Sequence, residues 1–424
     1  MANPFISFVI PVYNREKILE RTVASVLNTP FDDYEIVLVD DASMDGSGAL
    51  CDRLAASHHQ IRAIRLPVNV GVGGARNAGI DSARGAFLHF CDSDDSVDGA
   101  VLPKIAQRLR KNPDVDILTT NHRERTKDGS HTVRILEREE RCAVDRLLEE
   151  KPSLLHLGVC RSFYNKRFLA EHLLRFPSIQ IHEDLCFNGL ALLHAETAYA
   201  MPDVFYQYDR FVAANSLVAQ SGADQSADGF DVCATAFSAY FHTHGVKESK
   251  TRAVNSFVYA SAMLILSYIS SNTLSDWDLS QENSPEKVPA IDLALSDRAG
   301  IRGCVAALWR QIAGCARRAN AAERSVFLAP AGNVSRSVAR MLSEIGVEVC
   351  GFLDNSVKQD NFHIKAAAAG GHFSVEGFES VLGEGEREKS YVLITGSVNT
   401  SLSISRQLEG YGWTFGDDYM AFIR

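Results

Sequence analysis

The chain reads Ala86-Phe87-Leu88-His89-Phe90-Cys91-Asp92-Ser93-Asp94-Asp95, a mostly apolar run that ends in three carboxylates. Residues 86–90 are predicted to form a buried strand, so the acids follow at its carboxyl end. In an open α/β sheet, that edge binds ligands. Carboxylates this close together repel one another unless a cation or water lies between them. The stretch is therefore either a solvated acidic turn or a site for a divalent ion that also carries a diphosphate, and the surrounding sequence favours the second.

The first hundred residues alternate between apolar strands and helical segments. Predicted strands cover residues 7–13, 34–39, 61–66 and 86–90. A glycine-rich turn at residues 71–74 opens the helix before the last of them. Such alternation predicts a mostly parallel, twisted sheet with helices on both faces.

The pattern changes in the rest of the chain. Further segments are predicted as a strand at 115–120, a helix at 139–150, mixed helix and short strand around 181–184, and helices at about 226–270 and 291–321. A polar loop at 271–289 separates the last two, and a second α/β unit begins at 325–328. We therefore predict three parts, namely an α/β domain at 1–217, a helical extension and linker at 218–322, and a small α/β domain at 323–424.

Composition limits the class of protein. The 424 residues are 46% hydrophobic and 23% charged, with a net charge of −10, which argues against a nucleic-acid partner. Nine cysteines without a Cys-x-x-Cys pair predict reduced thiols. No run of about 18 apolar residues predicts a membrane span, and the first residues enter a strand directly. We expect a cytoplasmic chain, and the sequence leaves peripheral membrane contact and self-association open.

Four polar motifs are predicted to meet at one rim of the first sheet. They are Pro11–Asn14, Asp40–Ser43, Asn69–Gly71 with Ala75–Gly79, and Asp92–Asp95. This rim would offer carboxylates for a metal ion and for hydrogen bonds to a base or ribose, and Arg76 as a phosphate partner. Taken singly, each motif is equally typical of a turn, a helix cap or a helix surface.

Together, these motifs resemble those of the inverting nucleotide-sugar glycosyltransferases of family 2, which have the GT-A fold. Two later stretches also resemble that family. Glu183-Asp184-Leu185-Cys186-Phe187 is similar to its Glu-Asp element, and Tyr206-Gln207-Tyr208 with Ser216 is similar to the aromatic strand and serine that close its catalytic domain. The resemblance covers roughly residues 5–217, and five ordered motifs make it specific. It departs at Asp209-Arg210, where many relatives carry basic residues.

The resemblance implies roles for individual residues. Asp184 would be the catalytic base and Glu183 its supporting acid, although both also suit the start of a helix. Asp94 would bind a manganese or magnesium ion, with Asp92 either in the metal motif or nearer the ribose. The remaining implied contacts to the nucleotide sugar are Pro11, Tyr13, Asn14, Asp40, Asp41, Arg76, Asn77, Asp92 and Ser93, of which Asp41 would bond a uracil-type base.

The implied activity is metal-dependent, inverting sugar transfer. The donor would be a nucleoside-diphosphate sugar, with UDP expected first, and the acceptor a hydroxyl of a cell-surface carbohydrate or glycolipid. Alternatives are a non-catalytic nucleotide-sugar-binding scaffold, a sugar nucleotidyltransferase, and an oxidoreductase or epimerase that uses the C-terminal domain. The nucleotidyltransferase is disfavoured because Pro11–Asn14 replaces a glycine-rich, basic phosphate loop.

The C-terminal domain begins with a weakened dinucleotide fingerprint. Residues 326–335 have the strand, turn and helix order, but Gly332 is the one glycine kept of the three expected, with Pro330 and Ser335 at the others. Asp354 follows the next predicted strand, where a ribose-binding acid would lie. Two lost glycines disfavour dinucleotide binding, so the domain is predicted to be a structural, docking or oligomerisation module. It resembles the Rossmann-like domains appended to some polysaccharide-biosynthesis enzymes.

Overall fold

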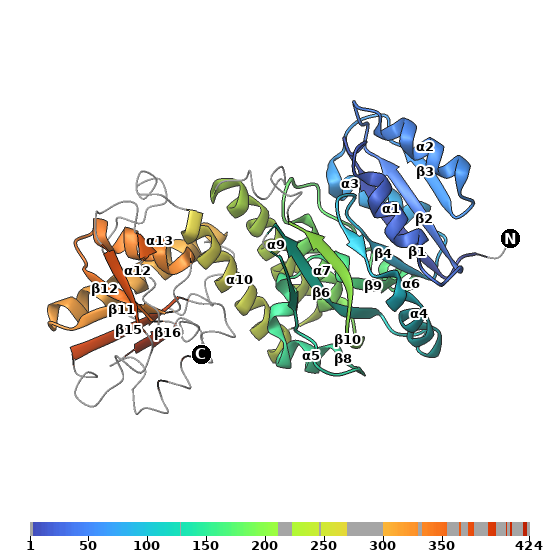
Figure 1. Cartoon of the computed structure of the whole chain (residues 1–424). Coiled ribbons are helices and arrows are strands. Elements are labelled where there is room, and N and C mark those ends of the chain that lie inside the picture. The colour runs from blue at the N-terminus through green and yellow to red at the C-terminus, as the bar shows by residue number, and fades with distance from the viewer. Residues whose placement is uncertain are drawn as a thin grey trace. The chain divides into compact units, whose positions relative to one another are not determined.

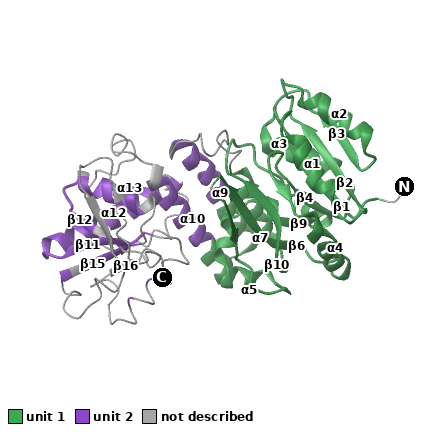
Figure 2. Cartoon of the chain, in the orientation of Figure 1, with its two compact units in different colours: residues 1–221, 236–253 green, residues 222–235, 254–424 purple. Residues whose placement is uncertain are grey.

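The computed structural model divides the chain into two compact units (Figure 1; Figure 2). The first comprises residues 1–221 and 236–253, and the second residues 222–235 and 254–424. The structure describes residues 3–127, 129–210, 223–245, 247–268, 300–329, 333–353, 364–365, 372–376, 389–395, 404, 408 and 419–421. Ser216, Pro330, Gly332, Asp354 and the loop at 271–289 lie outside the described residues.

The first unit is built on a single large sheet. Its described strands are β1 (Ile6–Val12), β2 (Tyr34–Asp40), β3 (Ile61–Arg65), β4 (Phe87–Phe90), β5 (Ser96–Val97), β6 (Ile117–Thr126), β7 (Gly129–Val133), β8 (Glu140–Ala143), β9 (Ser162–Asn165) and β10 (Thr197–Asp209). They pair in the order β3-β2-β1-β4-β9-β6-β10-β5, with β7 on β6 and β8 on β10. Strands β1 to β4 are mutually parallel, whereas β9 is antiparallel to β4 and β6. The predicted α/β fold with a mostly parallel sheet is confirmed.

Helices cover this sheet (Figure 1). They are α1 (Leu19–Leu27), α2 (Ser47–Ser57), α3 (Gly71–Ser82), α4 (Leu102–Lys111), α5 (Val144–Glu150), α6 (Lys166–Glu171) and α7 (Glu183–His194), with short 3-10 turns η1 (Gly99–Val101), η2 (Pro152–His156) and η3 (Val159–Arg161). Helix α3 packs closely on β1 because Gly79 has no side chain, and a Cβ there would overlap Val9. The close packing fixes where α3 presents its polar residues.

The central strands are covered on both faces. Every residue of β1, β2 and β4 is buried. Strands buried in this way have continuous apolar sequences, which is why they were predictable. In the core the rings of His89 and Phe163 stack with centroids 4.6 Å apart, and the Phe8 ring meets both of them edge-on. A packed core of this kind holds the loops at the carboxyl ends of the strands in fixed places.

Three segments differ from the sequence-based prediction. Residues 140–143 form β8 before helix α5 begins, because they pair antiparallel with β10. The prediction of a short strand around 181–184 is wrong, since helix α7 begins at Glu183. Strand β6 continues to Thr126 because it pairs with β7 and β10 beyond the predicted end at 120. In each case the deciding partner is distant in sequence.

The second unit contains a six-stranded sheet that is parallel except for β13, which is antiparallel to β14. Its described strands are β11 (Ser325–Ala329), β12 (Val349–Leu353), β13 (Ile364–Lys365), β14 (His372–Glu376), β15 (Ser390–Ile394) and β16 (Tyr419–Ala421), in the order β13-β14-β12-β11-β15-β16. The described helices that follow β10 in the chain are α9 (Ala223–His244), α10 (Glu248–Tyr268), α12 (Gly300–Ala321) and α13 (Asn333–Glu344). The pairs β14·β12, β12·β11, β11·β15 and β15·β16 are all parallel. Ser335 is buried and its hydroxyl lies 2.6 Å from that of Thr395. The Rossmann-like interpretation stays a prediction.

No helix in the described parts of the chain is long and apolar enough to cross a membrane.

Candidate active site

The turns after β1 and β2 are tied together by Asn14. Its backbone N–H donates to Ser43 Oγ at 3.0 Å, and its Oδ1 accepts from the Met44 N–H at 2.9 Å. Asn14 has a φ of 53°, in the left-handed region that Asn tolerates better than most residues. Strands β1 and β2 pair in parallel with Val12 opposite Asp40, so both turns leave the sheet at the same rim.

Asp40 and Asp41 are both buried at this rim. Asp40 Oδ1 accepts from the Ser43 N–H at 3.3 Å, and its Oδ2 lies 3.7 Å from Arg65 Nε. Asp41 Oδ1 accepts from the Val70 N–H at 2.8 Å. Burial raises the pKa of the Asp41 carboxyl despite this bond, which lowers it. The two acids are thus held rigidly by backbone and arginine contacts.

Apolar side chains are exposed around these acids. Tyr13 is 39% exposed, Val70 46% and Met44 83%, while Pro11 is buried. Single exposed apolar residues are common on protein surfaces and do not by themselves mark a ligand site. The nucleotide contacts implied for Pro11 and Tyr13 therefore stay predictions.

Arg76, in α3, joins two of the predicted motifs. It is 3% exposed, its Nη2 donates to Asp92 Oδ1 at 2.7 Å, and its Nη1 donates to Glu183 Oε1 at 2.6 Å. Burial alone would lower the pKa of this guanidinium, but the charges of Asp92 and Glu183 raise it. Arg76 therefore holds the acidic turn after β4 next to the first residues of α7. Its predicted phosphate contact stays a prediction, since both terminal nitrogens bind carboxylates here.

Asn77 anchors the segment that leads into α7. Its Nδ2 donates to Phe176 O at 2.9 Å, and its Oδ1 accepts from the Phe176 N–H at 2.9 Å. Gly73 lets the same segment approach, because a Cβ at Gly73 would stand 2.9 Å from Pro177 O. Helix α3 thus positions Glu183 through both Arg76 and Asn77. A nucleotide contact from Asn77 stays a prediction.

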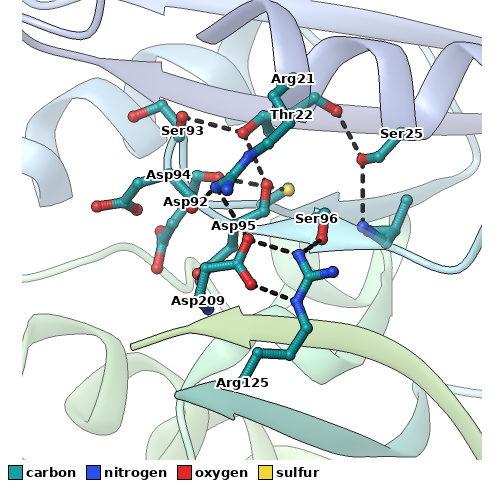
Figure 3. A network of polar contacts seen from close by, with 12 residues as sticks. Arg21, Thr22, Ser25, Asp92, Ser93, Asp94, Asp95, Ser96, Arg125 and Asp209 are labelled. Atoms are coloured by element: carbon teal, nitrogen blue, oxygen red, sulfur yellow. Dashed lines mark hydrogen bonds and ion pairs between the residues drawn. The ribbon is translucent and has the colours of Figure 1, made fainter. Parts of the chain in front are cut away.

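The backbone of the acidic turn is held by α1 (Figure 3). The Thr22 hydroxyl lies 3.0 Å from Ser93 O and 2.7 Å from Asp95 O, and Arg21 Nη2 donates to Asp94 O. Ser93 is 7% exposed. These contacts fix the main chain and leave the Asp94 carboxylate to other partners.

Asp92 and Asp94 differ in how their oxygens are occupied. Asp92 binds Arg76 through Oδ1 and accepts a weak bond from the Cys160 S–H on Oδ2, at 3.5 Å. The Asp94 carboxylate is 28% exposed, and its Oδ2 lies 3.6 Å from Arg15 Nη2. Burial and the charge of Asp92 raise the pKa of Asp94. A further cation beside Asp94 would therefore be stabilised.

Asp95 points into the protein rather than toward the rim. It is 4% exposed, and its carboxylate accepts from the Tyr206 O–H at 2.6 Å and the Asp209 N–H at 2.8 Å. Asp209 in turn pairs with Arg125 and, at 2.9 Å, with Arg21 (Figure 3). Asp209 is the residue at which the motif resemblance breaks down, and here its carboxylate is buried between two arginines. Asp95 and Asp209 are thus structural links between β4, β6, β10 and α1.

Asp184 stands at the start of α7 and faces Gly158. A Cβ at Gly158 would lie 2.5 Å from Asp184 Oδ2 and 3.1 Å from Tyr208 Oη, so the missing side chain makes room for both groups. Burial and the charge of Glu183 raise the pKa of Asp184 to about 7, against the opposing charge of Arg76. A carboxyl that titrates near neutrality is suited to general-base catalysis.

Gly158→Ala should therefore impair the Asp184 site. The added methyl would overlap Asp184 Oδ2, and a displacement of about 1 Å can cost on the order of 10²-fold in rate. We expect kcat for sugar transfer to fall by about that factor while nucleotide affinity is retained. Gly314→Ala is the control, since a Cβ at Gly314 would meet its nearest neighbour at 3.5 Å. Unchanged kcat in Gly158→Ala would contradict the assigned position of Asp184.

Sequence reasoning missed Gly158, Cys160 and the contacts of Arg15. None of the three lies in a motif with a spacing rule, and their partners Asp184, Asp92 and Asp94 are distant in the chain. The hydrogen bond between Asp95 and Tyr206 was also not predicted from the sequence, although both residues lie in the motifs described above. No sequence signal could have found these pairs.

A divalent metal ion fits this site only if a bound substrate supplies some of the oxygen atoms that coordinate it. The described residues hold no group of three or more His, Cys, Asp and Glu side chains that would bind a metal by themselves. Magnesium-type ions commonly bind through one or two carboxylates together with substrate phosphates. Asp94, with its raised pKa and accessible carboxylate, suits that arrangement, whereas Asp92 is engaged by Arg76 and Cys160.

The fold and the polar rim define a GT-A type nucleotide-sugar transferase domain, and comparison with known proteins agrees. Residues 7–174 match the family described as glycosyl transferase family 2. An uncharacterized glycosyltransferase of Bacillus subtilis, EpsJ, is 30% identical over 213 residues, which are 48% of this chain and 61% of that protein. An uncharacterized glycosyltransferase of Haemophilus influenzae is 28% identical over 61% of this chain and 94% of its own length. Residues 7–174 thus carry a glycosyl transferase family 2 domain.

Solved structures show the same fold. TarS of S. aureus superposes with a TM-score of 0.57 at 16% identity, over 87% of this chain and 60% of that one. TarS 1-349 in complex with UDP-GlcNAc has a TM-score of 0.51, also at 16% identity, over 87% of this chain and 99% of that one. At such low identity the likeness concerns the fold. The poly(ribitol-phosphate) beta-glucosyltransferase of Bacillus spizizenii is 31% identical over 48% of this chain and 32% of its own length.

Proposed function

We propose that the chain is a metal-dependent inverting glycosyltransferase. One observation carries the proposal, namely the buried bridge from Asp92 through Arg76 to Glu183. It places the acidic turn after β4 next to Asp184, whose pKa of about 7 suits a base. The match of residues 7–174 to glycosyl transferase family 2 supports this interpretation. A scaffold that merely binds a nucleotide sugar would not need a carboxyl tuned in this way.

In the proposed reaction the acceptor hydroxyl attacks the anomeric carbon of the donor. The new carbon–oxygen bond forms as the bond to the diphosphate breaks, so the configuration inverts and a nucleoside diphosphate leaves. The hydroxyl proton passes to Asp184 Oδ2, the oxygen that faces Gly158. Burial and the charge of Glu183 raise the pKa of Asp184, and the charge of Arg76 lowers it. Asp94 would bind a manganese or magnesium ion, which supplies positive charge to the departing diphosphate.

The proposed donor is a UDP sugar and the proposed acceptor a cell-surface carbohydrate. The TarS complex named for UDP-GlcNAc supports the choice of donor. Relatives named for minor teichoic acid and succinoglycan biosynthesis support a polysaccharide acceptor. The nine cysteines are free thiols, in line with a cytoplasmic location. The second unit is proposed to dock or to self-associate rather than to bind a dinucleotide.

A panel of UDP, GDP and dTDP sugars tests the proposal. The full chain is incubated with each donor and manganese, and released nucleoside diphosphate is measured with and without a carbohydrate acceptor. We expect slow release from a UDP sugar that increases with a suitable acceptor. Binding of the donor without any release, in the presence of every acceptor tried, would favour the scaffold alternative instead.

Asp94→Ala should weaken metal-dependent nucleotide binding. Loss of a charge-assisted contact is worth about 1.5–3 kcal/mol, so UDP affinity in manganese should fall by at least about tenfold. Calorimetry with manganese and with a chelator measures the difference, which we expect to disappear in the variant. Glu20→Ala is the control because Glu20 is an exposed acid on α1. Equal manganese dependence in Asp94→Ala and the native chain would exclude Asp94 as the ligand.

A further inference from the structure

Arg15 lies on the turn after β1 and reaches toward Asp94. Its backbone N–H donates to Ser47 Oγ at 2.6 Å, which fixes the main chain. Its Nη1 donates to Tyr13 O at 3.2 Å and Asn14 O at 3.3 Å, and its Nη2 lies 3.6 Å from Asp94 Oδ2. Its Nε is buried without a hydrogen-bond partner among the described residues. The guanidinium thus stands between a predicted base contact and the predicted metal ligand.

The pair between Arg15 and Asp94 is looser than the other ion pairs of the site. Arg76 binds Asp92 at 2.7 Å and is almost fully buried, whereas the Arg15 and Asp94 side chains are 33% and 28% exposed. A separation of 3.6 Å exceeds the usual hydrogen-bond range. Exposed pairs of this kind contribute little to stability. Arg15 can therefore leave Asp94 at small cost, while Arg76 cannot leave its carboxylates.

The charges at the rim favour an exchange of partners. Arg15 and a divalent cation cannot both stay beside the Asp94 carboxylate without repelling each other. A diphosphate offers Arg15 new oxygens, and a guanidinium binds phosphate with two parallel hydrogen bonds. Tyr13, on the same turn, is the predicted base contact and is 39% exposed. A nucleoside diphosphate lying along this turn would bring its phosphates within reach of Arg15.

We propose that Arg15 is a donor-binding residue that exchanges partners, pairing with Asp94 in the free protein and with the donor diphosphate in the complex. This inference rests on the proposed function and adds a residue that the sequence motifs did not assign. The exchange frees Asp94 for a divalent cation when the diphosphate arrives. Binding of nucleotide and binding of cation should therefore favour each other, and Arg15 should carry part of that coupling.

Arg15→Ala and Arg15→Gln, made in the full chain, test the exchange, because it predicts opposite changes in manganese affinity and UDP affinity. Manganese alone should bind two- to about fivefold more tightly, because Asp94 loses its competing cation. UDP in the presence of manganese should bind about tenfold more weakly, because the diphosphate loses a charged partner. Electron paramagnetic resonance measures free manganese, and calorimetry measures UDP. Lys17→Ala is the matched control, since it removes one exposed positive charge from the same loop.

The outcomes separate this inference from the proposed function. Tighter manganese binding together with weaker UDP binding in both variants, with Lys17→Ala unchanged, supports the exchange. Weaker or unchanged manganese binding in variants whose urea unfolding matches the native chain would overturn it, even if the native chain transfers sugar. Absence of sugar transfer by the native chain would instead count against the proposed function, because the manganese and UDP affinities do not depend on turnover.

Discussion

Asp184→Asn is expected to lose sugar transfer while keeping its nucleotide affinity. The asparagine side chain has nearly the same shape but cannot accept the proton of the acceptor hydroxyl. General-base catalysis is worth about 10²–10⁴-fold, so kcat should fall within that range. Released UDP measures turnover, and calorimetry with manganese measures donor binding. We expect UDP affinity to change less than about twofold, because Asp184 Oδ2 faces Gly158 and Tyr208 and none of the nucleotide contacts proposed for this site comes from Asp184.

The pH profile of the native chain provides an independent check. Asp184 acts as a base only when deprotonated, and its raised pKa of about 7 means that the free enzyme gains the active form as pH rises through neutrality. The value of kcat/KM should therefore rise through neutrality, reach half its maximum at about pH 7, and level off above about pH 8. Asp81→Asn is the control, since Asp81 is an exposed carboxylate paired with Arg175. Turnover of Asp184→Asn near that of the native chain would exclude Asp184 as the base.

Arg76→Met is expected to have the largest effect on stability. It removes the cation between Asp92 and Glu183 and leaves the Glu183 carboxylate, 5% exposed, without its charged partner. Removing one member of a buried ion pair costs about 3–5 kcal/mol in the free energy of unfolding. Urea unfolding followed by circular dichroism measures this loss. Arg175→Met breaks the surface pair with Asp81 and should cost at most about 1 kcal/mol.

A double variant distinguishes loss of charge from loss of packing. In Arg76→Met with Glu183→Gln the buried carboxylate becomes neutral, so part of the lost stability should return. Arg76 lowers the pKa of Asp184 and Glu183 raises it, so the single variant should shift the pH profile upward and the double variant should shift it back. A double variant less stable than Arg76→Met would contradict the role assigned to the bridge.

The first strands were predictable because their signal is local. Strands predicted at 34–39, 61–66 and 86–90 are β2, β3 and β4 to within one residue at each end. Each is a short apolar run between turn residues, and burial on both faces requires no more than that. The region around β8 was not predictable, since residues 140–143 have a helical pattern and become a strand through pairing with β10. Pairing with a distant strand overrides the local preference.

Part of the candidate site was predictable because the strands that lead into it have a local sequence signal. The carboxyl ends of parallel strands meet at one rim, so the acids after β2 and β4 could be placed from topology alone. Their individual partners could not be placed. Asp92 binds Arg76, Asp95 binds Tyr206 and Asp94 faces Arg15, although the three acids lie within four positions of the chain. The direction of each side chain depends on which helix or strand packs against it.

The sequence by itself determined the fold class, the order of the first strands and the resemblance of the first domain to glycosyl transferase family 2, because neighbouring residues carry apolar periodicity and short ordered motifs. Only the tertiary structure decided that Arg76 bridges Asp92 and Glu183, that Gly158 leaves room for Asp184, and that Asp95 is internal. These relations join residues from different elements, and the pKa of each carboxyl follows from the burial and charges that such contacts create. The order of residues in the chain does not directly indicate these contacts or the pKa values that result from them.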